Sequence, residues 1–155
     1  SMTQYPEEFV RRIPKTDLHV HLDGSLREQT LIDIAKEEKI DLPSYTPEGL
    51  NELVFKSHYA NLDEYLRGFG LTNKVMQRAE HLDQVAYELA MDNFAEGVRH
   101  LEVRFAPQLH MSDSLSFEQV MHAVDAGLHL LGRLWDGAKA AARQDNDDNT
   151  PGLDT

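Results

Sequence analysis

The chain has 155 residues, with 27 Asp and Glu against 15 Lys and Arg, and its formal net charge at pH 7 is −12. This acidity disfavours nucleic acid and anionic membrane surfaces as partners, and the lack of cysteine excludes disulfides and thiolate metal sites. No apolar run is long enough for a transmembrane helix, and the N-terminus has no signal-peptide pattern, so we expect a cytoplasmic protein with one domain over residues 1–155.

The first predicted elements are a short helix over residues 6–12 and a strand over residues 16–22. Side chains alternate along the strand, so the apolar ones share one face and the polar ones share the other. The apolar face carries Leu18, Val20 and Leu22. The polar face carries Asp17, His19, His21 and, just before Gly24 ends the strand, Asp23.

Capping residues and apolar periodicity predict a series of helices after this strand. Ser25 and Glu28 fit a capping box that opens a helix running to about residue 39. Thr46 precedes a proline that suits a helix start, and Asn61 is the expected cap of the next helix. A longer helix is expected over about residues 73–96, with the following glycine as its stop. The helix after the asparagine cap has an apolar stripe formed by Leu62, Tyr65, Leu66 and Phe69.

A second alternating strand is predicted in the segment RHLEVRFAP. Glu102 and Arg104 share its polar face, and we interpret them as a structural ion pair, because a charge inside a protein needs a partner. His110 follows in a loop and is interpreted as a solvated histidine rather than a metal ligand. Ser116 begins another capping box, whose helix is expected to run to about residue 143, followed by an acidic loop or tail over residues 144–155.

The order strand, helices, strand and helix predicts an α/β fold with parallel strands. A (β/α)8 TIM barrel explains the alternation, because the outer face of its strands meets helices and the inner face can hold polar groups. An open sheet with one hydrated face is the alternative. A complete barrel takes about 250 residues, so this chain would supply about the first two strand–helix units plus a helical insertion. Its unpaired strand edges favour self-association or marginal stability.

The H-x-H spacing makes His19 and His21 candidate metal ligands. Residues two apart on a strand point to the same side, about 6.5–7 Å apart along the chain, and can bind one ion together. A catalytic zinc site usually takes three protein ligands and a water, so at least one more ligand must come from elsewhere. The spacing alone is equally compatible with two exposed histidines. For Asp23 it leaves open a role as ligand, as partner of a ligand or as substrate contact.

Three segments together resemble the adenosine deaminase family. KTDLHVHLDGSL resembles its first strand, NLDEYLRGFGLTNKVMQ its helical insertion, and GVRHLEVRFAPQLH its second strand with the loop that follows. The resemblance extends over about residues 6–131. It implies a (β/α)8 barrel with one zinc ion and a small purine nucleoside as substrate. The implied reaction is hydrolytic deamination of adenosine or 2′-deoxyadenosine to inosine or 2′-deoxyinosine and ammonia.

By this resemblance, His19 and His21 match the first two zinc ligands, and His21 also lies beside the bound nucleoside. Asp23 matches the carboxylate that accepts a hydrogen bond from the ribose 5′-hydroxyl. Relatives that use free adenine tend to have Glu there, and those that use N6-methylated nucleosides tend to have Asn, so Asp23 favours adenosine or 2′-deoxyadenosine. The residues that match an apolar lid over the purine, or else form an ordinary core stripe, are Leu62, Tyr65 and Phe69.

No catalytic residue is assigned within this segment. The resemblance implies that a third histidine and an aspartate ligand, a general-acid glutamate, and a histidine and an aspartate that steer the water all come from later strands. The chain alone is therefore expected to be inactive. The alternatives are another metal-dependent barrel hydrolase, such as an adenine or modified-adenosine deaminase or a phosphoesterase, and a non-catalytic fragment.

Overall fold

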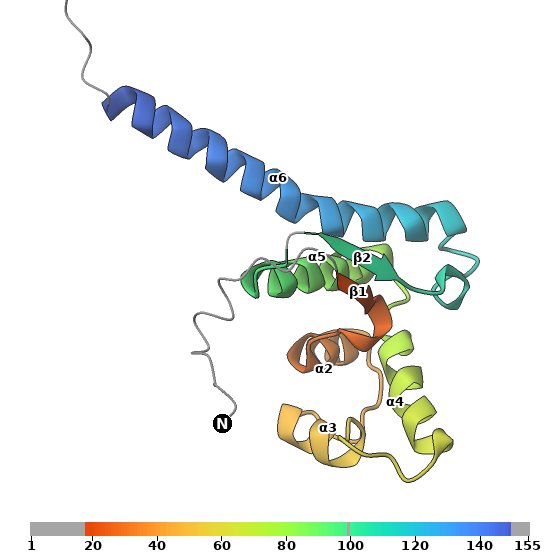
Figure 1. Ribbon diagram of the computed structural model, residues 1–155. Coiled ribbons are helices and arrows are strands. Elements are labelled where there is room, and N and C mark those ends of the chain that lie inside the picture. Colours follow the sequence, from red (N-terminus) through yellow and green to blue (C-terminus); the bar gives the residue numbers. More distant parts are fainter. Residues whose placement is uncertain (1–17, 99, 150–155) are drawn as a thin grey trace, which may run out of the picture.

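The computed structural model describes residues 18–98 and 100–149, and this part of the chain is mostly helical (Figure 1). The predicted helix over residues 6–12, and Asp17, lie outside the described residues. In chain order the elements are β1 (Leu18–His21), the 3-10 turn η1 (Leu22–Gly24), α2 (Glu28–Glu37), α3 (Pro47–Leu53), α4 (Leu62–Lys74), α5 (Ala79–Ala95), β2 (Leu101–Arg104), the 3-10 turn η2 (Pro107–Leu109) and α6 (Phe117–Asn149).

The two strands pair in parallel, as the order of elements predicts. Their polar residues are exposed, whereas the apolar residues Val20, Leu101 and Val103 pack against the core. The alternation predicted for both strands is therefore confirmed, and their polar faces form one continuous surface. In the register, the Cα partners are Leu18 and Leu101, His19 and Glu102, Val20 and Val103, and His21 and Arg104.

Most of the predicted helix ends form as expected. Thr46 and Asn61 each accept a hydrogen bond from the backbone N–H three residues later, at 3.1 and 3.0 Å. At the start of α6, Gln119 N donates to Ser116 Oγ (3.2 Å) and Ser116 N donates to Gln119 Oε1 (2.8 Å), which is a complete capping box. Gly97 follows α5 with a φ of 90°, a conformation that favours glycine.

The capping box predicted at Ser25 is wrong. The residue before α2 is Arg27, and it makes no side-chain capping hydrogen bond. The chain turns through η1 directly after β1, and Ser25 Oγ donates to His21 O (2.8 Å) across that turn. Ser25 therefore stabilises the segment that carries Asp23 instead of opening the helix.

The helix predicted over residues 73–96 begins later than expected, because α4 continues to Lys74 and α5 starts at Ala79 after a break. The break has a tertiary cause. Val75 and Met76 are 1% and 0% exposed, so the chain leaves the helix to bury them. Gln77 Nε2 then donates to the carbonyl oxygen of Leu109 (3.0 Å), which ties the break to the loop after β2.

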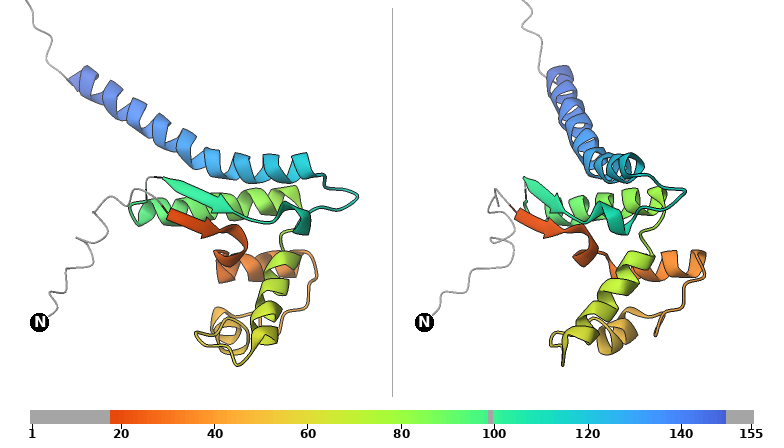
Figure 2. Two further views of the ribbon diagram at one scale, coloured as in Figure 1. Left: turned by 45° about the vertical axis from the view of Figure 1, so that its right-hand side comes forward. Right: turned by 90° about the vertical axis from the view of Figure 1, so that its right-hand side faces the viewer.

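The last helix is longer than predicted. α6 continues to Asn149, so residues 144–149 are helical and not the loop expected from their acidic composition. Neither glycine nor proline interrupts residues 138–149, and Asp and Asn within a helix cost it only a few tenths of a kcal/mol each. Residues 150–155 lie outside the described part of the chain. The C-terminal half of α6 reaches beyond the other elements (Figures 1 and 2).

α5 and α6 pack closely along the N-terminal half of α6 (Figure 2). Gly127 makes this approach possible, since an added Cβ there would lie 2.3 Å from Asp83 O and 2.9 Å from Ala86 Cβ. The largest fully buried apolar side chains of the described residues come from η1, α2, α3, α5, α6 and the break after α4. They are Leu22, Leu31, Ile32, Ile34, Leu50, Val75, Met76, Leu82, Val85 and Val120.

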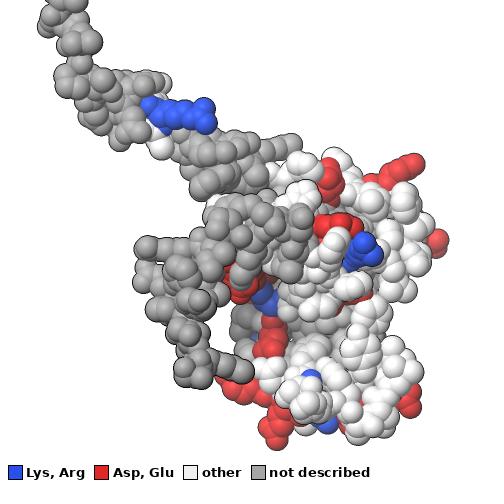
Figure 3. Space-filling model, in the orientation of Figure 1, with Lys and Arg blue, Asp and Glu red and all other residues white. Residues whose placement is uncertain are grey.

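Acidic side chains are scattered over the face shown in Figure 3, among uncharged ones. This distribution agrees with the net charge of −12, and such a surface repels polyanions at neutral pH. Within the described residues, every helix is too short or too polar to cross a bilayer.

The close approach at Gly127 yields a stability prediction. Gly127→Ala should lower the free energy of unfolding by about 1–3 kcal/mol, because α6 must move away from the α5 backbone. Gly70→Ala is the matched control: it also lies within a helix, but an added Cβ meets no atom within 4 Å. Alanine favours a helix there by up to about 1 kcal/mol. Urea unfolding followed by circular dichroism measures the stability of both variants. Equal unfolding midpoints for the two would contradict the close packing of α5 and α6 at Gly127.

Candidate functional site

The polar face of β1 brings together the residues that the sequence singles out. His19 and His21 are both exposed, and both line a hollow of about 710 Å³. Asp23 and Arg104 line the same hollow. Its size is in the range of small-molecule sites. The structure therefore places the two predicted metal ligands and the predicted substrate contact around one space, while the ligation itself stays a prediction.

Asp23 lies in η1, immediately after β1, and is only 8% exposed. It lines both the larger hollow and a neighbouring one of about 350 Å³. A carboxylate that is largely shielded from water forms strong hydrogen bonds to a donor that reaches it. The other side chains that line the smaller hollow are Leu26, Glu28, Leu31, Phe55, Tyr59, Tyr65, Phe69 and Thr72.

One face of α4 forms an apolar wall beside these hollows. Leu62, Tyr65 and Leu66 are 68%, 52% and 48% exposed, so the interpretation as an ordinary core stripe is wrong. Tyr65 and Phe69 line both hollows, and Leu66 lines the larger one. Tyr65 also meets Tyr59 edge to face, with ring centroids 5.6 Å apart. These exposed apolar side chains are therefore available to contact a ligand rather than the core.

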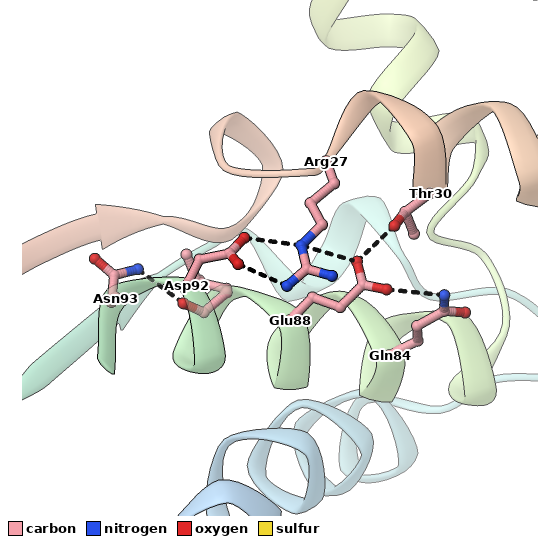
Figure 4. A network of polar contacts seen from close by, with 7 residues as sticks. Arg27, Thr30, Gln84, Glu88, Asp92 and Asn93 are labelled. Carbon is pink, nitrogen blue, oxygen red and sulfur yellow. Dashed lines mark hydrogen bonds and ion pairs between the residues drawn. The ribbon is translucent and has the colours of Figure 1, made fainter. Parts of the chain in front are cut away.

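A polar network holds the start of α2, and with it the end of η1, against α5 (Figure 4). Arg27 binds Asp92 through a fork of Nε to Oδ2 (2.9 Å) and Nη2 to Oδ1 (2.6 Å). The hydrogen bond that Arg27 donates to Asp92 raises the pKa of Arg27 above its ordinary value. Thr30 donates to Glu88, which also accepts from Gln84 Nε2 (3.0 Å). The network fixes the position of the chain just after Asp23.

Glu102 connects the two strands on their polar face. Its Oε1 accepts from Arg104 Nε and lies 3.2 Å from Arg104 Nη2, which confirms the contact between them, whereas the expected burial of the pair is wrong. Its Oε2 lies 3.0 Å from His19 Nδ1, a contact that was not predicted. This contact could have been predicted from the parallel register of the two strands, in which His19 and Glu102 are direct neighbours. All three side chains are at least half exposed, so the contacts add little to stability.

His110 is fully buried, so its interpretation as a solvated loop histidine is wrong. Its Nδ1 lies 2.9 Å from Met76 O, and because a carbonyl only accepts, Nδ1 carries the proton. Burial lowers the pKa of His110, which favours the neutral ring. The ring also packs beside Phe105. His110 thus joins the loop after β2 to the break between α4 and α5, and sequence periodicity carries no signal for this role.

Comparison with known proteins identifies the family. The model of the adenosine deaminase family matches residues 14–132. The chain belongs to the adenosine deaminase family. An adenosine deaminase of Clostridium botulinum (strain Hall) is 45% identical over 127 residues, which cover 81% of this chain and 38% of the relative. The chain therefore spans well under half the length of this deaminase.

Solved structures support the relationship at the level of the fold. An N6-methyl-AMP deaminase from Arabidopsis thaliana superposes with a TM-score of 0.63 and 29% identity, covering 80% of this chain and 35% of that one. An amidohydrolase from Burkholderia ambifaria with bound Zn has a TM-score of 0.65 and 20% identity, covering 86% of this chain and 36% of that one. The elements of this adenosine deaminase family member are thus arranged as in deaminase and amidohydrolase folds.

A second group of possible ligands lies where the C-terminal end of α2 meets the start of α5. The ligand atoms of Glu37, Glu38, Glu80 and His81 lie within 4.8 Å of one another. Arg78 forms ion pairs of 3.0 Å with both Glu38 and Glu80, so a guanidinium already balances this group. We interpret it as an ion-pair network between the helices of this deaminase-family chain and not as its metal site.

The buried His110 predicts a loss of stability on acidification. Its pKa in the folded chain is lower than the ordinary value of 6.5, so below that pH the unfolded chain binds more protons than the folded chain. The stabilisation is fully present above about pH 6.5 and is lost as the pH falls through the folded-state pKa. One proton gives a slope of at most about 1.4 kcal/mol per pH unit.

Urea unfolding at a series of pH values measures this slope. His110→Gln keeps an N–H donor for Met76 O but does not titrate, so its stability should fall less steeply than that of the wild type. His122→Gln, at an exposed position of α6, is the control and should retain the wild-type slope. Identical slopes in all three proteins would rule out the buried histidine as the cause.

Proposed function

We propose that this chain forms the N-terminal, zinc- and nucleoside-binding part of a (β/α)8 adenosine deaminase. The substrate would be adenosine or 2′-deoxyadenosine, and the products inosine or 2′-deoxyinosine and ammonia. The observation that carries the proposal is the end of β1, where His19, His21 and Asp23 line one hollow in a chain of the adenosine deaminase family. The parallel strands support the barrel, and a cytoplasmic location is part of the same proposal.

The donor set on β1 fits a zinc ion. Imidazole nitrogen is a preferred zinc ligand, and His19 and His21 share one exposed strand face, so both rings are accessible from the same hollow. They would hold the ion together with at least one ligand from another segment. Bound zinc supplies a water of lowered pKa, the nucleophile that hydrolytic deamination at C6 of the purine requires.

The other residues of the site would bind and orient the nucleoside. Asp23 would accept a hydrogen bond from the ribose 5′-hydroxyl, and its shielding from water strengthens that bond. The apolar wall of α4, chiefly Tyr65 and Phe69, would contact the purine and exclude water. Asp23 and Glu28 both line the smaller hollow, so a 5′-phosphate there would meet like charge. This supports a nucleoside as substrate rather than the nucleotide of the Arabidopsis enzyme.

A chimera tests the activity directly. In it, this chain replaces the matching 127 residues of the Clostridium botulinum deaminase, which supplies the rest of the fold. We expect conversion of adenosine to inosine, measured by absorbance, with loss on chelation and recovery with zinc. His19→Ala and His21→Ala should each reduce the rate to background, because each removes a ligand. His122→Ala should have no effect. An active chimera that tolerates both ligand substitutions would refute the proposal.

The role of Asp23 has a separate test in the same chimera. A hydrogen bond to a charged group contributes about 1.5–3 kcal/mol, so the unmodified chimera should prefer adenosine over 5′-deoxyadenosine by about 10- to 100-fold in kcat/KM. Asp23→Ala should lower kcat/KM for adenosine to the value for 5′-deoxyadenosine and leave the latter unchanged. A preference that survives Asp23→Ala would place the 5′-hydroxyl elsewhere, and faster turnover of AMP than of adenosine would favour a nucleotide deaminase.

A further inference from the structure

The carboxylate of Glu102 lies between two side chains of the polar strand surface and uses a different oxygen for each. Oε2 lies 3.0 Å from His19 Nδ1, and Oε1 contacts Arg104 at 3.2 Å. We propose that Glu102 is a positioning residue for the metal site, which holds His19 with its proton on Nδ1 and presents Nε2 to the ion. This inference rests on the proposed metal site of His19 and His21.

The 3.0 Å contact between Nδ1 and Oε2 indicates which nitrogen of His19 is free. A carboxylate only accepts, so a neutral His19 ring that turns Nδ1 to Glu102 has its proton on that nitrogen. In the neutral ring, the lone pair is then on Nε2, on the side of the imidazole away from Glu102. A metal-binding histidine commonly donates its other ring N–H to a carboxylate in this way, which fixes the tautomer and raises the basicity of the ligand.

Arg104 completes the arrangement in two respects. Its guanidinium holds Oε1 through Nε and Nη2, which fixes the orientation of the carboxylate while Oε2 faces His19. It also places a positive charge beside the proposed cation site, since it is the register partner of His21. The Glu102 carboxylate offsets that charge. Glu102 therefore acts on the site both by orienting a ligand and by balancing a neighbouring cation.

These contacts are poorly suited to stabilising the fold. The side chains of His19, Glu102 and Arg104 are 61%, 50% and 62% exposed, and exposed ion pairs contribute little to the free energy of unfolding. Their geometry is nevertheless defined, because parallel pairing makes His19 and Glu102 direct neighbours across the strands. An effect on metal affinity without an effect on stability is what distinguishes the positioning role from a structural one.

The tautomer can be measured on the metal-free chain. Two-bond ¹⁵N–¹H NMR correlation spectra, recorded above the pKa of an ordinary histidine, report which ring nitrogen carries the proton. We expect His19 to have its proton on Nδ1 in the wild type and on Nε2 in Glu102→Ala, since a free imidazole favours the latter. The spectrum of His21 should be the same in both. A wild-type His19 with its proton on Nε2 would overturn the inference.

The metal affinity is measured in the chimera, in which the Clostridium botulinum part supplies the remaining ligands, by competition for zinc with a chromophoric chelator. Loss of a partner of a metal ligand typically costs 10- to 100-fold in affinity, so Glu102→Ala should weaken zinc binding by about this factor. Glu102→Gln keeps an acceptor and should fall between it and the wild type. Glu52→Gln, an exposed position on α3, removes the same charge elsewhere and should leave the affinity unchanged.

The outcomes separate this inference from the proposed function. If the unmodified chimera binds zinc and His19→Ala does not, but Glu102→Ala binds as tightly as the unmodified chimera, the positioning role of Glu102 is refuted and the metal site stands. If the unmodified chimera binds no zinc at these histidines, the proposed function fails first. Thermal unfolding of Glu102→Ala should match that of Glu52→Gln, and a large drop confined to Glu102→Ala would show a structural role instead.

Discussion

The parallel register of β1 and β2 is the constraint on which the candidate site depends. It sets His19 beside Glu102 and His21 beside Arg104, so that the possible metal ligands and the groups that act on them share one surface. A slip of one residue in either strand would turn its side chains to the opposite faces. His19 would then point into the core and Val20 into water. Burial of the apolar face therefore fixes the register, and the register fixes the polar face.

The second requirement is that the chain just beyond β1 stays in place, because Asp23 belongs to a short turn and not to the sheet. Two contacts meet this requirement. Ser25 closes the turn by donating to His21 O, and Arg27 joins the next residues to Asp92 on α5 through a charged fork. These contacts thus connect the strand that carries His19 and His21, the turn that carries Asp23, and α5. Substitutions that weaken the contact between Arg27 and Asp92 are therefore expected to shift the position of Asp23, although neither helix contributes a proposed metal ligand.

Sequence reasoning succeeded where the determining interaction is local. Asn61 caps its helix through an atom three residues away, and His19 alternates with its neighbours because any strand does so. It failed where a distant segment decides the outcome. Met76 lies outside the helices because its side chain is buried in the core. Ser25 donates to the preceding turn instead of capping the following helix. His110 is buried against the carbonyl of Met76, 34 positions away, a contact that no periodicity encodes.

A comparison of His81, His110 and the histidine pair on β1 shows that access to a possible metal site matters more than the number of carboxylates around it. His81 is nearly buried among carboxylates, but Arg78 already neutralises two of them, so a cation would gain little there. Among the described residues, His110 is buried with Nε2 lacking a hydrogen-bond partner, and it belongs to no group of three or more possible metal ligands. The pair on β1 has fewer neighbouring carboxylates than His81, but it lies on an open hollow beside a shielded acid. A catalytic metal needs an accessible position for water and substrate. The hollow beside β1 offers that access, which is the physical reason to propose the metal site there and not in the more acidic group between α2 and α5.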